Sequence, residues 1–488
     1  MNDRIRGFHR VVFIIALILH ALTAWFSTGY HSEDEHHQVI GFAETWSGEL
    51  PPGEQAWEYQ ARIRASALPW IAVGVFKAAH VGGIDDPFTK ALLLRMLTTA
   101  LALIAVRGFV RAMLDQLSAD LWKPFVVLSY FLWFLPFLHV RFSSETWSGL
   151  FLLMGLTAAL KNDRDRWWAV RTGALLATAV WIRPPVAVIV TSFFLWVLLV
   201  RKDTRQELFR FVGAAAVVLL LSVVMDSSFY GTWTISPWRY AHIGVIGDPE
   251  HVFDALPWYY YVPWVVKYAI PPIGLCLLLA LLLLLWKRPT QPLVWCVLPF
   301  LLIHSILPHK EIRFLYPLAD LMPILMIAGY QEARPVLTGT VNGRPLIRLC
   351  VGLFAVVNTL GLAVASTSPA GNGRVDLARV VRDRPMSEPI RIAYLTDPKF
   401  AWRVCFPHFY RARGTSDTII ATGMTVDAIP ADLLIARATD VRTLNDRCGQ
   451  CMKKIVSAEP EWTTPLLRLY SWGDRPEPWM LYAAEPSK

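Results

Sequence analysis

The amino-acid sequence predicts an all-α polytopic membrane protein with a small α/β domain outside the membrane at its C-terminal end. Composition is the first observation: hydrophobic residues make up 55% of the 488 residues, and the mean hydropathy of +0.40 is far above that of soluble proteins. Arrangement is the second, because apolar runs that approach the ~20 residues of a membrane-spanning helix recur as far as residue 366. Polar, turn-rich sequence replaces these runs beyond that point.

About eleven membrane-spanning helices are expected. The first apolar run has a basic flank at Arg4, Arg6 and Arg10, as a signal peptide would, but no small-residue cleavage site follows it. We therefore interpret it as a retained first helix. The runs 146–160 and 169–182 are short for a full crossing. The predicted helices cover residues 11–27, 91–107, 123–139, 146–160, 169–182, 186–200, 211–228, 265–286, 292–307, 314–330 and 346–366.

Lys and Arg collect in alternate loops, which is typical of the cytoplasmic side of a membrane protein. With the N-terminus inside, the outer side receives the acidic loop 28–90, four later loops or turns (141–145, 183–185, 230–264 and 309–313) and the C-terminal residues. This pattern explains the net charge of +9 without a nucleic-acid partner. The absence of an Asn-x-Ser/Thr sequon favours a bacterial inner membrane with the outer side facing the periplasm. In a eukaryote the same side would face the endoplasmic reticulum lumen.

Two domains are predicted: a membrane domain over residues 1–366, with 28–90 as its first outer loop, and a C-terminal domain over residues 367–488. The strings RIAYLTD (391–397) and DLLIAR (432–437) are typical of buried strands between turns. Cys448 and Cys451 form a CxxC pair. Because no thioredoxin-like helix pattern follows them, we interpret them as a structural disulfide or idle thiols rather than a redox motif.

The first outer loop begins with HSEDEHHQ (31–38), which places three carboxylates and three imidazoles directly after an apolar helix. A carboxylate beside an apolar wall can act as a general base toward a hydroxyl group. The same residues suit a solvated helix N-terminus. Histidine and aspartate also suit a metal site, although no matching set of ligands follows in the chain. On the residues alone, all three interpretations remain open.

Three further polar clusters lie at helix ends on the predicted outer side, where ionisable residues are candidates for function. Each has a structural alternative: an interfacial amphipathic helix, an arginine that reaches to the surface, or an ion-paired turn. Converging arginines and lysines would instead suit a phosphate or a sugar. The clusters are residues 57–69, the two tight turns RFSSE (141–145) and WIRPP (181–185), and HKEIRFLYP (309–317).

Taken in order, six strings resemble the polyprenyl-phosphate-mannose-dependent α-mannosyltransferases of glycosyltransferase family 22, whose members build GPI anchors and N-glycan precursors. HKEIRFLYP is the most specific of the six. The resemblance covers nearly the whole membrane region and implies a GT-C fold, with a lipid-linked donor that enters from the bilayer. The strings are DEHHQ (34–38), WEY with a following Arg and Pro (57–69), RFSSE (141–145), RPP (183–185), DSSFYG (226–231) and HKEIRFLYP (309–317).

The resemblance also implies roles for single residues. Asp34 matches the family's catalytic Asp and Glu35 the neighbouring Glu, so Asp34 is the expected general base. Ser32 and Glu33 replace the usual His-Pro, which leaves Glu35 as the alternative base. The residues expected to bind the donor phosphate are Lys310, Arg313, His309 and Arg183. Those expected to bind substrate are Gln38, Glu58, Arg64, Arg141, Glu145, Glu311 and Tyr316.

The expected function is the inverting transfer of a sugar from a polyprenyl-phosphate donor to a lipid-linked glycan or glycolipid. The resemblance to the family implies that the sugar is mannose. Because cationic side chains can neutralise the leaving phosphate, no metal or other cofactor is expected. A transporter or flippase of a lipid-linked or anionic substrate is the main alternative, which predicts inverted repeats and charges near the membrane midplane. A receptor or assembly subunit that works through its C-terminal domain is the third.

Overall fold

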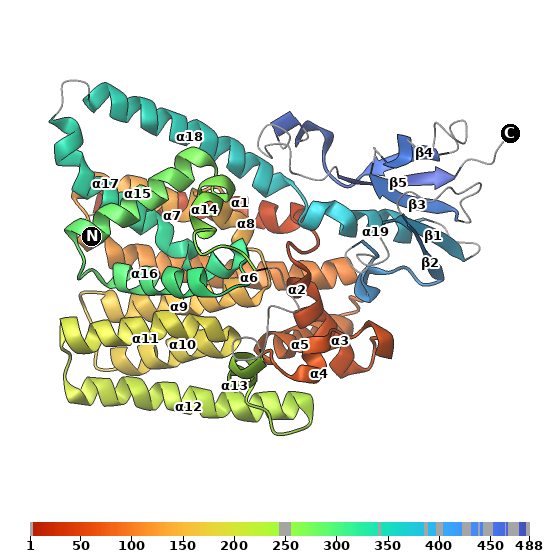
Figure 1. The fold of residues 1–488 in the computed structure, drawn as a ribbon, viewed down its shortest axis with the longest axis horizontal. Helices are drawn as coiled ribbons and strands as arrows, with labels where there is room; N and C mark the ends of the chain where they lie inside the picture. Colours follow the sequence, from red (N-terminus) through yellow and green to blue (C-terminus); the bar gives the residue numbers. More distant parts are fainter. Residues whose placement is uncertain are drawn as a thin grey trace.

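The computed structural model describes residues 3–243, 255–339, 343–384, 389–396, 404–421, 431–437, 440–442, 452–463, 465–466 and 478–484. Long helices run roughly along the longest axis of the molecule, and a five-stranded sheet stands at one end of them (Figure 1). Each predicted apolar run falls on one helix or on two consecutive ones, which confirms the all-α membrane region. The helices and the 3-10 segment η9 of this bundle are α1 (Asp3–Phe26), α6 (Pro87–Met113), α7 (Trp122–Phe131), α8 (Phe134–Leu138), α9 (Ser144–Leu160), α10 (Trp168–Ile182), α11 (Ala187–Trp196), α12 (Arg205–Tyr230), α14 (Tyr261–Tyr268), α15 (Pro271–Lys287), α16 (Pro292–Ile306), η9 (Ile312–Leu321), α17 (Met322–Thr338) and α18 (Gly343–Thr367).

Among the described residues, six helical segments are long and apolar enough to cross a membrane, and α15 with α16 makes a seventh if the pair, bent by 119°, counts as one span. The outermost helices expose apolar side chains: Leu220 of α12 is 68% exposed and Leu349 of α18 is 69% exposed. A continuous exposed surface of this kind is unfavourable in water and is normal against lipid. The chain is therefore an integral, multi-pass membrane protein.

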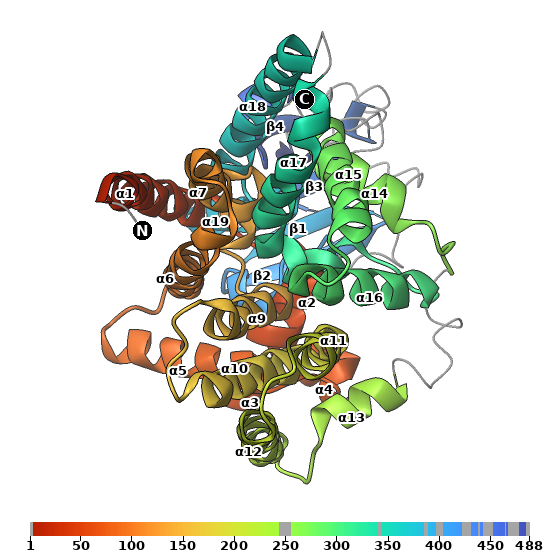
Figure 2. The ribbon, with the colours of Figure 1, turned by 90° about the vertical axis from the view of Figure 1, so that its left-hand side faces the viewer.

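Helix α9 lies inside the bundle, packed against α6, α10 and η9 (Figure 2). Its contact with η9 depends on Gly149, because a Cβ atom there would lie 3.0 Å from the Cα atom of Pro317. Ser143 begins α9 as an N-cap, with its hydroxyl accepting a hydrogen bond from the amide of Thr146 at 3.2 Å. The close approach of Gly149 to Pro317 brings the N-terminal turn of α9, which carries Glu145, next to the start of η9.

Short helices gather at the end of the bundle to which α1 leads (Figure 1). All of them except α13 belong to the predicted first outer loop. They are α2 (Glu33–Glu35), the π-helical turn η1 (His36–Ile40), α3 (Gly41–Ser47), α4 (Trp57–Ala61), α5 (Ala67–Val81) and α13 (Ser236–Ala241).

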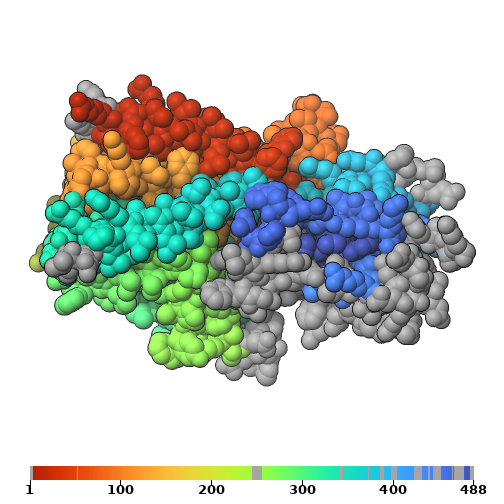
Figure 3. Space-filling model, turned by 90° about the horizontal axis from the view of Figure 1, so that it is seen from above, coloured from red at the N-terminus to blue at the C-terminus, as the bar shows by residue number. Residues whose placement is uncertain are grey.

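The C-terminal domain contains α19 (Arg374–Arg382) and a sheet in the order β2-β1-β3-β5-β4. Strands β1 (Ile390–Leu395) and β3 (Leu433–Arg437) fall on the two predicted strands. They pair in parallel with each other, and β2 (Thr415–Ile420) is parallel to β1. The antiparallel strands are β4 (Met452–Ser457) and β5 (Trp479–Ala484). Figure 3 shows this domain adjoining the end of α18. The CxxC cysteines, Cys448 and Cys451, lie outside the described residues.

Candidate active site

Two buried arginines fix the point at which α1 passes into the first outer loop. Arg141 donates from Nη2 to the carbonyl of Ser27 at 2.5 Å and from Nη1 to that of Gly29 at 3.1 Å. Arg95 of α6 donates from Nε to the carbonyl of Ala24 at 2.8 Å. The last carbonyls of a helix have no partner within the helix, and a guanidinium satisfies both their hydrogen bonds and their partial negative charge. In this conformation Arg141 therefore holds the loop in place, and its predicted contact with substrate stays a prediction.

Arg313, at the start of η9, lies among three carboxylates. Its Nη1 atom is 2.6 Å from Oδ2 of Asp34 and 3.4 Å from Oε1 of Glu145. Its Nε and Nη2 atoms donate to the two oxygens of Glu311 at 2.5 and 2.8 Å, a bidentate pair. The hydroxyl of Ser32 accepts from Nη1 at 3.0 Å. The structure thus brings together residues of the first outer loop, α9 and the 309–317 turn. This agrees with the prediction that these segments lie on the same side of the membrane.

Asp34 is held in its ionised form. Burial acts to raise the pKa of its carboxyl group, but the guanidinium groups of Arg313 and Arg64 outweigh that effect, so its pKa lies below the ordinary value. Nη2 of Arg64 is 3.6 Å from Oδ2 of Asp34. A carboxylate that is charged at neutral pH is ready to accept a proton.

Glu35, the next residue, has a different environment. One of its oxygens accepts the backbone amide of His31 at 2.9 Å, and the other is 3.7 Å from Nη1 of Arg141. Burial raises the pKa of Glu35 above its ordinary value despite the charge of Arg141. Glu35 thus braces the backbone of the loop, whereas Asp34 lies in the arginine cluster, and this difference favours Asp34 as the base.

A second hydrogen-bonded group extends from Asp34 toward α4. The amide of Gln38 donates to Oε1 of Glu58 at 2.9 Å, and Nη2 of Arg64 is 3.9 Å from the same oxygen. Burial raises the pKa of Glu58. A space of only about 20 Å³ lies between this group, Asp34 and Arg183. That volume holds about one water molecule, so the space is nearly closed in this conformation.

Arg183 connects α10 to the cluster. Its Nη1 atom is 2.9 Å from Oε1 of Glu145 and donates to the hydroxyl of Ser144 at 3.1 Å. The same Glu145 oxygen therefore lies between Arg183 and Arg313. Glu145 thus fixes both guanidinium groups in place beside the carboxylates that Arg313 also contacts.

The 309–311 turn is held by its own side chains. The ammonium of Lys310 donates to the carbonyl of Leu256 at 2.9 Å and to that of Leu307. Nε2 of His309 is 3.0 Å from Oε1 of Glu311. Lys310 is buried and, like Arg313, does not line either cavity of the site. A phosphate would have to replace these carbonyls to reach Lys310, so its predicted phosphate contact is not formed in this conformation.

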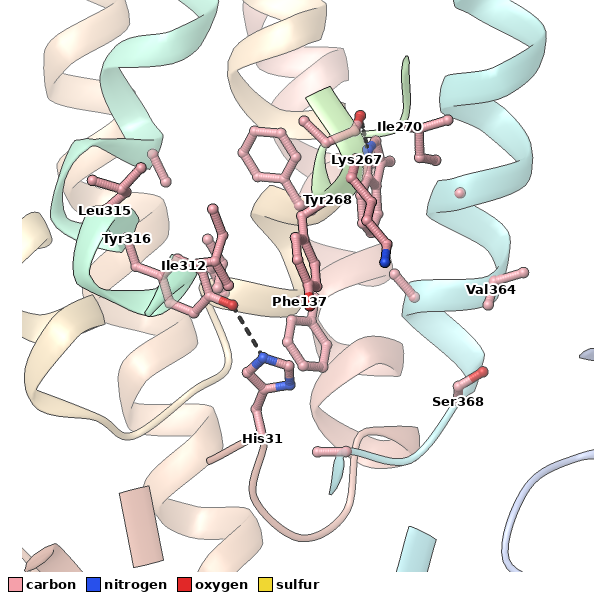
Figure 4. Close-up of a pocket in the computed structure, with 18 of the residues that line it drawn as sticks. His31, Phe137, Lys267, Tyr268, Ile270, Ile312, Leu315, Tyr316, Val364 and Ser368 are labelled. Atoms are coloured by element: carbon pink, nitrogen blue, oxygen red, sulfur yellow. Dashed lines mark hydrogen bonds between the residues drawn. The ribbon is translucent and has the colours of Figure 1, made fainter. Parts of the chain in front are cut away.

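A cavity of about 1220 Å³ opens beside the cluster, between α8, α14, α15, η9, α17 and α18. Its walls are largely apolar, and its polar lining includes His31, Lys267 and Tyr316 (Figure 4). Glu33 and Arg374 line it as well. The phenol of Tyr316 lies 3.0 Å from Nε2 of His31, which marks the boundary between the cavity and the carboxylate cluster. Typical small-molecule pockets measure ~300–1,000 Å³. The size and apolar walls of this cavity suit a long lipid chain whose polar end points toward Arg313.

The C-terminal domain is docked onto the first outer loop through three acidic residues of that loop. Glu33 pairs with Arg374 of α19, and Oε1 of Glu54 is 3.2 Å from Nη1 of Arg411. Glu44, whose side chain is 3% exposed, lies 2.8 Å from Nδ1 of His408. Burial raises the pKa of Glu44 to about 7 even though His408 acts in the opposite direction.

Glu44→Gln is expected to make folding stability less dependent on pH. Glu44 keeps a proton in the folded protein at pH values where the unfolded chain has lost it, so the wild type should lose stability as pH rises from about 4.5 to about 7. A shift of this size is worth at most about 3 kcal/mol. In thermal unfolding experiments in detergent, the melting temperature of the variant should rise relative to that of the wild type as pH increases. A difference that is constant across this range would contradict the prediction, and Glu54→Gln reports the general effect of removing a carboxylate from the loop.

The residues that sequence reasoning missed are mainly structural supports. Arg95 had a signal, because it is an ionisable residue within the apolar run 91–107. Ser32, Arg374 and His408 had none, since their partners are distant in sequence. Asp226 belongs to a quoted string, and the structure shows its carboxylate accepting from the amide of Ser66 at 2.8 Å and so holding the start of α5.

Among the described residues, no group of three or more His, Cys, Asp or Glu side chains is arranged to hold a metal ion. The expectation of a metal-independent reaction stays a prediction. The histidines of the first outer loop, which the sequence left without a role, are partly accounted for by packing. The ring of His36 stacks on Tyr30 at a centroid distance of 4.9 Å and lies 5.5 Å from the ring of Tyr410.

A membrane helix bundle with a carboxylate, clustered arginines and a large apolar cavity at one end is the arrangement that the GT-C fold expected from the sequence would have. The crystal structure of ArnT from Cupriavidus metallidurans bound to undecaprenyl phosphate has the same fold, with a TM-score of 0.55 at 11% identity over 98% of this chain and 99% of that one. The apo form of ArnT gives 0.54 at 12% identity over 99% of both chains. These likenesses concern the fold alone.

The chain belongs to the Alg9-like mannosyltransferase family, whose pattern it matches over residues 11–368. Mannosyltransferase APTG1 of Arabidopsis thaliana is 25% identical to it over 68% of this chain and 60% of its own length. GPI alpha-1,2-mannosyltransferase 3 of Bos taurus is 27% identical over 63% and 58%, and the Homo sapiens protein of that name is 27% identical over 61% and 51%. The chain thus matches half to three fifths of the length of these relatives. The resemblance seen in the sequence, to a family of glycosyltransferases, is confirmed.

Proposed function

We propose that this protein transfers mannose, with inversion, from a polyprenyl-phosphate donor to a hydroxyl group of a lipid-linked glycan or glycolipid. One observation carries the proposal: ionised Asp34 lies 2.6 Å from Arg313, next to the polar end of a lipid-sized cavity. Such a pairing supplies a proton acceptor and a cation for a leaving phosphate within one cluster.

The donor occupies the 1220 Å³ cavity with its polyprenyl chain between α15, α17 and α18. Its phosphate reaches the polar end, where Tyr316 and His31 meet and Arg313 lies just beyond. The relatives' names support mannose as the sugar, and ArnT, of the same fold, was crystallised with undecaprenyl phosphate.

In the reaction, the acceptor oxygen attacks the anomeric carbon of mannose while the bond from that carbon to the phosphate oxygen breaks. Asp34 takes the proton of the acceptor hydroxyl, and polyprenyl phosphate leaves with the electron pair of the broken bond. Attack from the side opposite the phosphate turns a β-linked donor into an α-linked product. Arg313, with Arg183 sharing Glu145 behind it, neutralises the charge that develops on the phosphate.

The acceptor enters on the side of Gln38 and Arg64, which line the small space beside Asp34, with Glu58 hydrogen-bonded behind Gln38. Because that space holds about one water molecule, the segment 62–66 has to move to admit a sugar hydroxyl. The site faces the extracytoplasmic side in this proposal. The basic N-terminal residues begin α1 at the opposite end of the helix, and 24 residues of helix span about 36 Å.

The test is an assay of purified protein in lipid nanodiscs with labelled polyprenyl-phosphate mannose and a membrane lipid extract as acceptor source. We expect label in a glycolipid fraction, undiminished by EDTA. Replacing Ala319, a lining residue of the cavity, by Trp should raise the KM for the donor, because the indole would fill part of the cavity. If no labelled product forms with any polyprenyl-phosphate sugar, the proposed function is wrong. If product forms but is lost when EDTA is added, the expectation of a metal-independent reaction is wrong.

A further inference from the structure

Three polar side chains, two of them buried and the third 10% exposed, form a hydrogen-bonded chain inside the helix bundle, and none of the three lines either cavity. Nε2 of His20, on α1, lies 3.0 Å from Nδ1 of His139, which follows α8. Nε2 of His139 lies 2.8 Å from Oδ1 of Asp320, on η9. The ring of His20 is completely buried and that of His139 is 1% exposed. Groups of this kind are costly at membrane depth and call for an explanation.

The hydrogen bonds of this chain fix the number of protons it holds. The third bond joins Nδ1 of His20 to the carbonyl of Ala16 at 2.8 Å. Three hydrogen bonds need three protons, and two neutral imidazoles supply two of them. A third proton, in the hydrogen bond between His139 and Asp320, completes the set and balances the carboxylate charge. The chain is then fully hydrogen-bonded and has no net charge, which is the condition for stable burial.

The chain joins the three segments that carry the candidate active site. His20 lies on α1, which leads directly into the loop of Asp34. His139 comes just before Arg141 and the N-terminal turn of α9, which carries Glu145. Asp320 lies on η9, the same 3-10 segment as Arg313 and Tyr316.

We propose that His20, His139 and Asp320 are positioning residues that set the separation between Asp34 and Arg313. None of the three touches substrate in this proposal. Their hydrogen bonds hold α1, the start of α9 and η9 in one register, so the ion pair 2.6 Å long at the site forms without further adjustment. The activity part of this inference rests on the proposed mannosyl transfer, whereas the structural part does not.

The chain offers a matched control on the same helix. Nε2 of His9 lies 2.8 Å from the phenol of Tyr130 and is also buried. This bond ties α1 to α7, which carries no residue of the candidate site. His9→Phe therefore removes a buried hydrogen bond of α1 without loosening η9 or the start of α9.

Two substitutions at Asp320 separate hydrogen bonding from charge. In Asp320→Asn the amide supplies the third proton, so all three hydrogen bonds persist without an added charge. In Asp320→Leu, Nε2 of His139 loses its partner. We expect Asp320→Leu to lower kcat about tenfold or more, through misplacement of Arg313, while the KM for polyprenyl-phosphate mannose stays within about twofold. Asp320→Asn and His9→Phe should keep kcat within about threefold of the wild type.

Hydrogen exchange provides the readout that needs no transfer activity. Backbone amides of residues 28–38 and 312–321 should exchange faster in Asp320→Leu than in the wild type, and not in Asp320→Asn or His9→Phe. If the wild type does not transfer mannose, the proposed function is wrong. The hydrogen-exchange measurement then still tests the positioning role, because it does not depend on transfer activity. Unchanged exchange in Asp320→Leu, or an equal loss of kcat in Asp320→Asn or His9→Phe, would overturn the positioning role itself.

Discussion

Asp34→Asn is expected to reduce mannosyl transfer by about 10³-fold or more, because removal of a general base costs ~10²–10⁴-fold and no other carboxylate shares its place beside Arg313 and Arg64. Asparagine has nearly the same shape and can still accept a hydrogen bond from Arg313. Donor binding and folding should therefore survive. The measurement is kcat in nanodiscs, together with donor binding and thermal unfolding of the same preparation.

Two companions make the Asp34 experiment decisive. Glu35→Gln tests the neighbouring carboxylate, which is buried against Arg141 and braces the backbone of His31. It should lose much less activity than Asp34→Asn. Glu54→Gln removes an acidic side chain of the same loop that pairs with Arg411 away from the cluster and should stay close to wild type. A larger loss in Glu35→Gln than in Asp34→Asn would move the base to Glu35.

Arg313→Ala is expected to have the second largest effect, on stability as well as on activity. The change leaves Asp34, Glu145 and Glu311 without a common cation, and breaking a buried ion pair in this way costs about 3–5 kcal/mol. Transfer should fall by about 10²–10³-fold, since the leaving phosphate also loses its nearest charge. Thermal unfolding and kcat measured on one preparation would separate the two effects.

Arg313→Lys keeps the charge but not the bidentate geometry, so it should restore part of the stability and little of the activity. Arg239→Ala is the matched control, because Arg239 lies at the same end of the bundle and donates to a single carbonyl, that of Ala61, at 3.2 Å. Arg313→Ala with normal kcat would remove Arg313 from the proposed phosphate site.

Much of the fold was accessible from the sequence because hydrophobic runs and the distribution of basic loops are local signals. Their helices appear where they were expected, and so do two strands of the C-terminal domain. The site was accessible as a set of strings but not as a set of contacts. In the structure Arg313 contacts Asp34, whereas Lys310 donates to backbone carbonyls. These contacts depend on how helices that are distant in sequence pack together, so they could not be predicted from the strings.

The roles of buried arginines show this limit most clearly. Arg141 and Arg183 both follow apolar runs and lie in tight turns, so their sequence contexts are nearly equivalent. In the structure one satisfies carbonyls at the end of α1 and the other pairs with Glu145. The difference arises because a different helix end lies next to each turn. The positions of these residues along the sequence do not show which helix end that is.

The two spaces at the candidate site are very unequal: about 1220 Å³ in the lipid cavity, which His31 and Tyr316 line, and about 20 Å³ between Asp34 and Gln38. A protein in this conformation has room for one substrate only. Steady-state kinetics should then follow a compulsory order, with donor before acceptor, and an acceptor analogue should be an uncompetitive inhibitor with respect to donor. The same inequality limits wasteful hydrolysis of the donor, because the small volume beside Asp34 keeps bulk solvent away from the proposed base.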